Sequence, residues 1–133
     1  MYIERDLERE INNYIKNREI IAIVGPRQSG KTTLLKKIFD NLKNGIFLDF
    51  EDREVLELIN ENIKAFVDLY VKKYDYLFID EFQYAKDGGR NLKYIHDAYK
   101  IKIFISGSST SELTIQGTKY LVGRVFVFNL YPL

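Results

Sequence analysis

Eight consecutive residues near the start of the chain have the composition of a phosphate-binding loop. The pattern G-x-x-x-x-G-K-[ST] is matched at every fixed position by Gly25-Pro26-Arg27-Gln28-Ser29-Gly30-Lys31-Thr32. A loop that wraps a phosphate with consecutive backbone N–H groups needs glycine where side chains would collide. We expect Lys31 to reach the β- and γ-phosphates of a nucleotide and the Thr32 hydroxyl to coordinate Mg²⁺. The alternative is a chance match in a strand–helix turn.

The segments on either side of this loop supply the context that the motif requires. Residues 19–24 read Glu-Ile-Ile-Ala-Ile-Val, a largely β-branched run that is typical of a strand buried on both faces. Beyond the loop, apolar residues recur at helical spacing, at Leu34, Leu35, Ile38, Phe39 and Leu42. A helix that begins at Lys31 directs its unsatisfied amides and its positive dipole end at the same anion.

Two carboxylates follow another buried strand later in the chain. The apolar run Tyr76-Leu77-Phe78-Ile79 is followed directly by Asp80 and Glu81. We predict that Asp80 holds Mg²⁺ through water and that Glu81 positions and polarises the water that attacks a phosphate. An isolated pair of this kind would be better interpreted as two solvated carboxylates. The helix, strand and helix predicted between the loop and the pair favour the functional interpretation.

A small polar cluster ends a third apolar run, Ile103-Phe104-Ile105-Ser106-Gly107-Ser108-Ser109. A hydroxyl group at this point would orient the attacking water or contact the γ-phosphate, and we place Ser108 ahead of Ser106 for this role. The alternative is an ordinary Ser/Gly turn that caps the next helix and needs no nucleotide.

Four further polar residues are weaker candidates. Arg124 follows Gly123 just before the last predicted strand, and is either an arginine finger that reaches a phosphate across a subunit boundary or a surface arginine. Gln83 lies two residues after the acidic pair and is a candidate to sense the γ-phosphate. His96, the only histidine, is expected to be hydrogen-bonded or solvated rather than catalytic. The Arg27 side chain, at a variable position of the loop, is expected to face solvent or a neighbour.

Strands and helices alternate along the whole chain. Besides the elements named above, the apolar patterns predict helices over residues 3–15, 55–70 and 92–99, strands over 46–50, 101–106 and 124–130, a loop over 86–90 and a helical turn over 109–113. Such alternation implies a parallel sheet that helices cover on both faces. Ligands of such sheets bind at the carboxyl ends of the strands, where the three polar motifs lie.

Composition narrows the class of protein. The 133 residues correspond to one small domain, and 46% hydrophobic and 29% charged residues are enough for a buried core. A formal net charge of +1 gives no reason to expect a polyanionic partner. The absence of cysteine excludes disulfides, and no apolar run approaches the roughly 20 residues of a membrane span. We therefore expect a cytoplasmic protein without membrane contact.

Together these motifs resemble the AAA+-related branch of P-loop ATPases, and more narrowly the prokaryotic ATPases, common in archaea, that carry G-P-R-Q-x-G-K-T-T near the start. The resemblance covers the whole chain and extends the nucleotide-binding segment through Thr33. The matching segments are Gly25 to Thr33, Ile79-Asp80-Glu81-Phe82-Gln83, Ser106-Gly107-Ser108-Ser109, Leu121-Val122-Gly123-Arg124 and Leu130-Tyr131-Pro132-Leu133.

The resemblance implies an α/β fold of the P-loop NTPase type, a three-layer α-β-α sandwich around a five-stranded, mainly parallel sheet of order 5-1-4-3-2. It implies ATP with Mg²⁺ as the bound nucleotide, Glu81 as the catalytic base, and the N-terminal helix near the base and ribose. Members of this family continue beyond the Pro-Leu at 132–133 with a helical lid and often further domains. We therefore expect residues 1–133 to be the ATPase core without that lid. A homo-oligomer or a partner protein would supply an arginine, and nucleic acid would be contacted only through the further domains.

Four functions stay open at this point. The leading hypothesis is Mg-dependent ATP hydrolysis carried by Lys31, Thr32, Asp80 and Glu81, weakened where the lid is missing. A nucleotide-gated binding module would instead bind ATP with little turnover and signal through a change of shape. A GTPase would carry a base-reading Asn-Lys-x-Asp tetrapeptide, which does not occur in the sequence. A small-molecule kinase is disfavoured because the acidic pair and the serine-ended strand indicate water as the phosphate acceptor.

Overall fold

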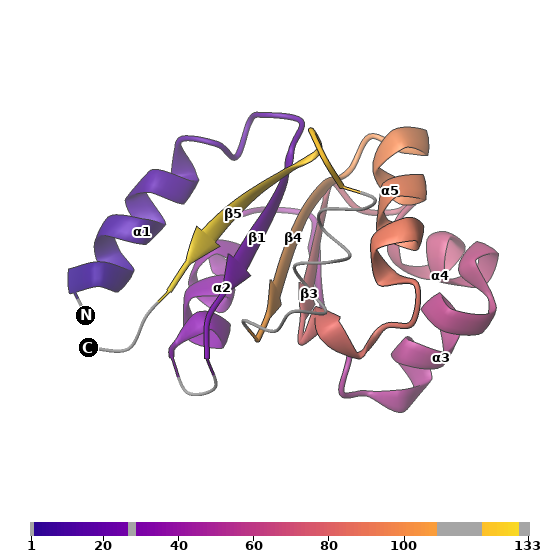
Figure 1. The fold of residues 1–133 in the computed structure, drawn as a ribbon. Coiled ribbons are helices and arrows are strands. Elements are labelled where there is room, and N and C mark those ends of the chain that lie inside the picture. Colours follow the sequence, from indigo (N-terminus) through magenta and orange to yellow (C-terminus); the bar gives the residue numbers. More distant parts are fainter. Residues whose placement is uncertain (1, 27–28, 109–120, 131–133) are drawn as a thin grey trace.

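The computed structural model describes residues 2–26, 29–108 and 121–130. Its elements in chain order are α1 (Tyr2–Asn12), β1 (Ile20–Val24), α2 (Lys31–Asp40), β2 (Gly45–Asp49), α3 (Arg53–Glu61), α4 (Ile63–Tyr70), β3 (Tyr76–Asp80), the 3₁₀ helix η1 (Phe82–Tyr84), α5 (Gly88–Ala98), β4 (Lys102–Gly107) and β5 (Val125–Asn129). Figure 1 shows a twisted sheet with helices packed on both faces. In the described ranges, no helix combines the length and the apolar character needed to cross a membrane.

The five strands form one sheet in the order β2-β3-β4-β1-β5, and every neighbouring pair is parallel. This is the expected order 5-1-4-3-2 counted from the other edge, so the predicted topology is confirmed. Ile21 of β1 lies opposite Phe104 of β4 and Phe126 of β5. Because all strands run the same way, the segments that follow β1, β3 and β4 meet at one end of the sheet, the carboxyl edge. The opposite end is called the amino edge below.

Alternating side chains divide the interior into two cores, one on each face of the sheet. In β1, Ile20 and Ala22 belong to the core that packs against α3, α4 and α5, whereas Ile21 and Ile23 belong to the core beneath α1 and α2. All four side chains are buried. Burial on both faces explains why this strand has a continuous apolar sequence rather than an alternating one.

Aromatic rings fill the core beneath α2. Phe78 and Phe104, on neighbouring strands, stack with ring centroids 4.4 Å apart and an interplanar angle of 4°. Phe39 of α2 meets Phe78 edge-on at 5.3 Å, and Phe47 stacks on Phe78 at 6.2 Å. Each such pair contributes about 0.5–1.5 kcal/mol beyond the burial of its area. The cluster therefore fixes how α2, and with it the loop that precedes α2, lies on the sheet.

Two predicted elements differ from the structure. The single helix predicted over 55–70 is two helices, because Asn62 has a non-helical backbone and its side chain accepts a hydrogen bond from Ala65 N at 3.1 Å, which caps α4. The loop predicted over 86–90 is in part the first turn of α5, where Gly88 and Gly89 are buried. The turn predicted over 109–113 lies outside the described residues.

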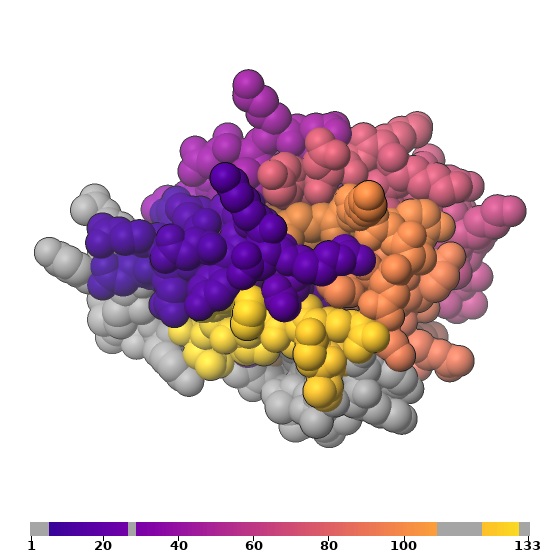
Figure 2. Space-filling model, turned by 90° about the horizontal axis from the view of Figure 1, so that it is seen from above, coloured from indigo at the N-terminus to yellow at the C-terminus, as the bar shows by residue number. Residues whose placement is uncertain are grey.

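At the amino edge, Lys102 joins the connection between α1 and β1 to the start of β4. Its ammonium group donates hydrogen bonds to the carbonyl oxygens of Tyr14 (3.0 Å), Asn17 (2.7 Å) and Glu19. Figure 2 looks onto this edge, where the indigo N-terminal segment, the orange segment around β4 and the yellow β5 meet. Burial lowers the pKa of Lys102 to about 8, against the opposing attraction of Glu19.

We predict that Lys102→Met lowers the free energy of unfolding by about 1–3 kcal/mol near neutral pH. The substitution preserves an apolar stem but leaves three carbonyl oxygens without their donor, and the contacts to Tyr14 and Glu19 are partly buried. Urea unfolding of the parent and the variant, followed by circular dichroism, measures the difference. Equal stability would show that water replaces the ammonium group at no cost.

The same pair of proteins tests the pKa of Lys102. The usual lysine pKa is 10.5 and the folded-state pKa is about 8, so the unfolded chain binds more protons than the folded chain between these values. Stability contributed by Lys102 therefore rises as the pH rises from about 8 to about 10.5. The difference in unfolding free energy between the parent and Lys102→Met should widen over this range, and a narrowing difference would contradict the assignment.

Candidate functional site at the carboxyl edge

The phosphate-loop sequence connects β1 to α2 at the carboxyl edge. Gly25 N donates to Gly107 O at 3.2 Å, so the loop leaves the sheet beside the end of β4. A Cβ atom on Gly25 would lie 2.4 Å from Leu130 O and 2.7 Å from Ser29 Oγ. Atoms do not approach this closely, and Gly25 is therefore required for the loop to pack against the residue that follows β5.

Ser29 and Lys31 place polar groups in this loop that an oxyanion would satisfy. Ser29 Oγ is buried and has no hydrogen-bond partner among the described residues. The side chain of Lys31 is also buried, with 5% of its surface exposed, and its Nζ lies 3.4 Å from Pro26 O. Buried polar groups are normally paired, so an unpartnered hydroxyl and an ammonium group in one loop fit the oxygens of a phosphate.

The first turn of α2 is open to an anion. Gly30, at φ 89° and ψ 9°, has a left-handed conformation that glycine adopts at little cost, and it has no side chain with which to cap the helix. The first turn, Lys31-Thr32-Thr33, contains no acidic residue. No described side chain caps these amides, so they and the positive dipole end suit a negatively charged group.

Thr32 and Asp80 connect the loop to the acidic pair. Thr32 Oγ1 donates to Asp80 Oδ2 at 2.9 Å, although 48 positions separate the two residues in the sequence. Ser106 Oγ donates to the other oxygen, Oδ1, so both carboxylate oxygens accept from hydroxyl groups. Asp80 is 5% exposed and Ser106 is fully buried. A buried carboxylate needs such partners, and this pairing brings α2, β3 and β4 together at one point.

Glu81 occupies the turn between β3 and η1. Its backbone has φ 58° and ψ 46°, a left-handed conformation that is uncommon for a residue other than glycine, asparagine or aspartate. Its N–H points at Asp80 Oδ1 (3.2 Å) and Ser106 Oγ (3.4 Å), and its Oε1 accepts from Gln83 Nε2 at 3.0 Å. A conformation of this kind costs on the order of 1 kcal/mol, and here the surrounding hydrogen bonds hold it in place.

The structure gathers most of the residues that the sequence singled out. Around the carboxyl edge lie Gly25, Ser29, Gly30, Lys31, Thr32, Asp80 and Glu81. Ser108 joins them through its backbone N–H, which donates to Gln83 Oε1 at 3.3 Å. Pro26 and Thr33 are exposed, and Arg27 and Gln28 lie outside the described residues.

The role predicted for Ser108, to orient the attacking water or contact the γ-phosphate, stays a prediction, but the two serines differ in their contacts with the acidic pair. The hydroxyl that touches an acidic side chain belongs to Ser106, not to Ser108. The available signal was position: Ser106 pairs with Ile23 inside the sheet, beside the strand that carries Asp80, whereas Ser108 follows the end of β4. The link between Gln83 and Glu81 was also missed, although their spacing of two residues places them on one turn.

Arg124 lies at the amino edge, away from the loop. Its carbonyl oxygen accepts from Ile20 N, at the start of β1, at 2.7 Å. Its guanidinium group makes two hydrogen bonds to Asp97, at 2.9 and 3.1 Å, and together with His96 it holds the pKa of Asp97 at about 2. Arg124 is thus no part of this chain's own phosphate site, and to act on another subunit it would first have to leave Asp97.

His96 belongs to the same network and has the structural role that its sequence context predicted. The ring is 7% exposed, with Nε2 3.0 Å from Arg18 O and Nδ1 3.1 Å from Asp97 Oδ1. In return, the Arg18 guanidinium donates to the backbone oxygens of His96 and Tyr99.

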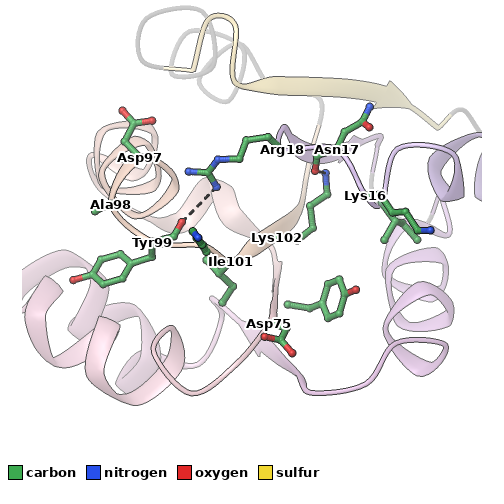
Figure 3. A pocket seen from close by; sticks show the side chains of 12 residues that line it. Lys16, Asn17, Arg18, Asp75, Asp97, Ala98, Tyr99, Ile101 and Lys102 are labelled. Carbon is green, nitrogen blue, oxygen red and sulfur yellow. Dashed lines mark hydrogen bonds between the residues drawn. The ribbon is translucent and has the colours of Figure 1, made fainter.

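A cavity of about 700 Å³ opens at the amino edge, lined in part by Lys16, Arg18, Asp75 and Lys102. Figure 3 shows the Arg18 side chain extending across it to Tyr99 O, at 3.4 Å. The Arg18 and Lys102 cations both already donate to backbone carbonyl oxygens. This cavity is part of the hydrogen-bond network that closes the amino edge and lies at the opposite end of the sheet from the acidic pair.

A family model described as an AAA domain matches residues 17–133. The match runs from just before β1 to the end of the chain and includes the phosphate loop and the acidic pair. This chain belongs to the AAA domain family. The assignment and the sheet order confirm the resemblance to AAA+-related P-loop ATPases.

Solved structures with the same fold as this AAA domain include several Pif1 helicases. One, from a study of DNA unwinding at forked dsDNA by two coordinating Pif1 helicases, has a TM-score of 0.61 and 14% identity over 100% of this chain and 44% of that one. Pif1 from Candida albicans has a TM-score of 0.69 and 10% identity, covering 100% and 40%. Pif1 from Bacteroides in complex with ADP-AlF3 and ssDNA has a TM-score of 0.60 and 17% identity, covering 96% and 42%. The AAA domain thus spans less than half of each helicase chain.

We predict that Gly25→Ala lowers the free energy of unfolding of the AAA domain by about 1–3 kcal/mol, because the new methyl group forces apart Leu130 O and Ser29 Oγ. Gly45→Ala is the matched control, since its added Cβ would lie 3.3 Å from Phe39 and Tyr76, a much milder approach than the 2.4 Å from Leu130 O at Gly25. Urea unfolding compares the two variants with the parent. A smaller loss at Gly25 than at Gly45 would contradict the assigned role of the close contact.

Proposed function

We propose that this AAA domain binds ATP together with Mg²⁺ and hydrolyses the bond to its γ-phosphate. The observation that carries the proposal is the 2.9 Å hydrogen bond between Thr32 Oγ1 and Asp80 Oδ2. Hydroxyl and carboxylate oxygens are ligands that Mg²⁺ prefers, and these two meet where the start of α2 faces the end of β3, and Thr32 directly follows the buried Lys31. The hydrogen bond holds them in proximity until a cation takes its place.

Each residue of the site has a separate role in this proposal. The backbone amides of the loop from Gly25 to Gly30 and the Lys31 ammonium group bind the phosphates, and Thr32 with Asp80 would hold Mg²⁺. When bound, Mg²⁺ would neutralise charge on the β- and γ-phosphate oxygens. Glu81 orients the attacking water and accepts its proton, so the protein contributes positioning and charge stabilisation.

The polar groups of the loop fit such a ligand. Ser29 Oγ is a buried oxygen without a partner among the described residues, and the first turn of α2 carries no acidic residue that would occupy its amides. One fold neighbour, Pif1 from Bacteroides, was solved with ADP-AlF3 and ssDNA. Its fold supports a nucleotide site here. The net charge of +1 gives no comparable support for a nucleic-acid site in this chain.

We predict that Mg-ATP at about 100 times its dissociation constant stabilises the protein by roughly 2.7 kcal/mol, a rise in melting temperature of roughly 10 °C. Lys31→Ala should abolish this rise, and Mg-GTP should give a smaller one. Glu81→Gln should keep the rise and lose most of the phosphate release, because its amide cannot accept the proton of water. Differential scanning fluorimetry and a phosphate-release assay measure the two effects.

The outcomes of this experiment separate the alternatives. If Mg-ATP stabilises the protein but each protein molecule does not complete several turnovers, the protein is a nucleotide-gated binding module and not a hydrolase. Equal phosphate release by the parent and Glu81→Gln would remove Glu81 from its assigned role. No stabilisation by either nucleotide would refute the proposal as a whole.

We further predict that Ser106→Ala weakens the affinity for Mg²⁺ in the presence of ATP by about 10-fold, while leaving the affinity for metal-free ATP nearly unchanged. Ser106 holds Asp80 Oδ1, and loss of a residue that orients a metal ligand typically costs 10–100-fold in metal affinity. Titration of MgCl₂ at fixed ATP, followed by phosphate release, gives the constant. Ser108→Ala is the control, and an equal effect of both substitutions would argue against a specific role for Ser106.

A further inference from the structure

Gln83 connects the second acid to the segment after β4. It lies in η1, and its side-chain amide makes a hydrogen bond at each end. Its Nε2 donates to Glu81 Oε1 at 3.0 Å, and its Oε1 accepts from Ser108 N at 3.3 Å. A carboxylate can only accept and a backbone N–H can only donate, so a flipped amide would lose both hydrogen bonds.

The turn that carries Gln83 is anchored in the core. Phe82, the preceding residue, is 1% exposed and stacks on Phe50 with ring centroids 5.9 Å apart. Tyr84 N donates to Glu81 O at 3.3 Å, and Ala85 N donates to Phe82 O at 3.1 Å. Because the backbone is held on both sides, the Gln83 amide forms a defined link between its two partners and is not a freely rotating surface group.

Besides the contact of Glu81 N with Ser106 Oγ, two links run from the side chains of the acidic pair to the end of β4. The first is the direct hydrogen bond from the Ser106 hydroxyl to Asp80, which is buried and lies within the sheet. The second passes from Glu81 through Gln83 to the backbone of Ser108, which follows the last residue of β4. The second link ends on a residue outside the ladder of the sheet.

We propose that Gln83 is a positioning residue, which sets the orientation of the Glu81 carboxylate according to the position of the Ser108 backbone, just after β4. The proposal rests on the function proposed above, in which Glu81 activates the attacking water. A neutral amide suits this task because it orients the carboxylate by hydrogen bonding and adds no positive charge that would weaken it as a proton acceptor. In this arrangement, a γ-phosphate that displaces Ser108 would change where Glu81 points.

The first test measures turnover in Gln83→Leu, which keeps the approximate size of the side chain and removes both hydrogen bonds. We expect kcat to fall about 10-fold, with KM and the stabilisation by Mg-ATP unchanged, because misorientation of a catalytic group affects the chemical step. Gln83→Glu, which keeps the size and polarity but is ionised and cannot donate, should show the same loss. Tyr84→Leu, at an exposed neighbour on the same turn, is the control and should leave kcat unchanged.

A double-mutant cycle decides whether Gln83 acts through Glu81. In the Glu81→Gln background, Gln83→Leu should lower the residual rate by less than about 2-fold, since its target has already been removed. An equal loss in both backgrounds, or a rise in KM alone, would overturn the proposal.

A second test needs no hydrolysis. In the nucleotide-free, ¹⁵N-labelled protein, Glu81→Ala should shift the amide resonance of Ser108, and this shift should disappear when Gln83 is leucine. Coupling without turnover would support the link and refute the hydrolytic function. If the parent hydrolyses ATP but Glu81→Ala does not shift the Ser108 resonance, the proposed function is supported and the role of Gln83 is refuted.

Discussion

Asp80 is a buried carboxylate, and the hydrogen bonds that it requires organise the carboxyl edge. One oxygen accepts from Thr32 at the start of α2 and the other from Ser106 in β4. The burial of Asp80 therefore depends on the correct relative positions of α2, β3 and β4. A buried charge left unpaired costs several kcal/mol, which is a large part of the stability of a domain of this size. The contacts that place two oxygen ligands side by side therefore also hold the fold together.

Two features near Asp80 lower the stability of the fold, and both lie where we expect catalysis. Glu81 holds a left-handed backbone, and Ser29 Oγ lacks a partner among the described residues. Both features raise the free energy of the folded protein without ligand. Neither lies in the aromatic core beneath α2. Strained and unsatisfied groups of this kind persist where the surrounding structure over-determines them. Here the surroundings are the aromatic cluster of Phe39, Phe78 and Phe104 and the hydrogen bonds of Asp80.

Sequence patterns were sufficient for the parallel sheet and the position of the loop, because residues 20–24 are apolar without interruption and Gly30-Lys31-Thr32 starts a helix. They were insufficient where one side chain determines the end of a helix or the partner of a charged group. Asn62 breaks one predicted helix into two by capping the second half, and apolar periodicity does not register a cap. Arg124 had a suitable residue type, but only the tertiary fold reveals Asp97 as its partner. The contact between Ser106 and Asp80 likewise depends on strand register, which a single sequence does not specify.

The close approach of β5 to the phosphate loop makes the shape of the loop depend on the position of this edge strand. Among the described strands, β5 pairs only with β1. Leu130, the residue after it, donates to Val24 O at 2.7 Å, and its own carbonyl oxygen lies against Gly25. An edge strand is held along one side only, so a force along its axis is resisted by one ladder of hydrogen bonds. Because a Cβ atom on Gly25 would lie 2.4 Å from Leu130 O, the loop has no spare room on this side, and the position of β5 relative to β1 sets the space that the loop can occupy.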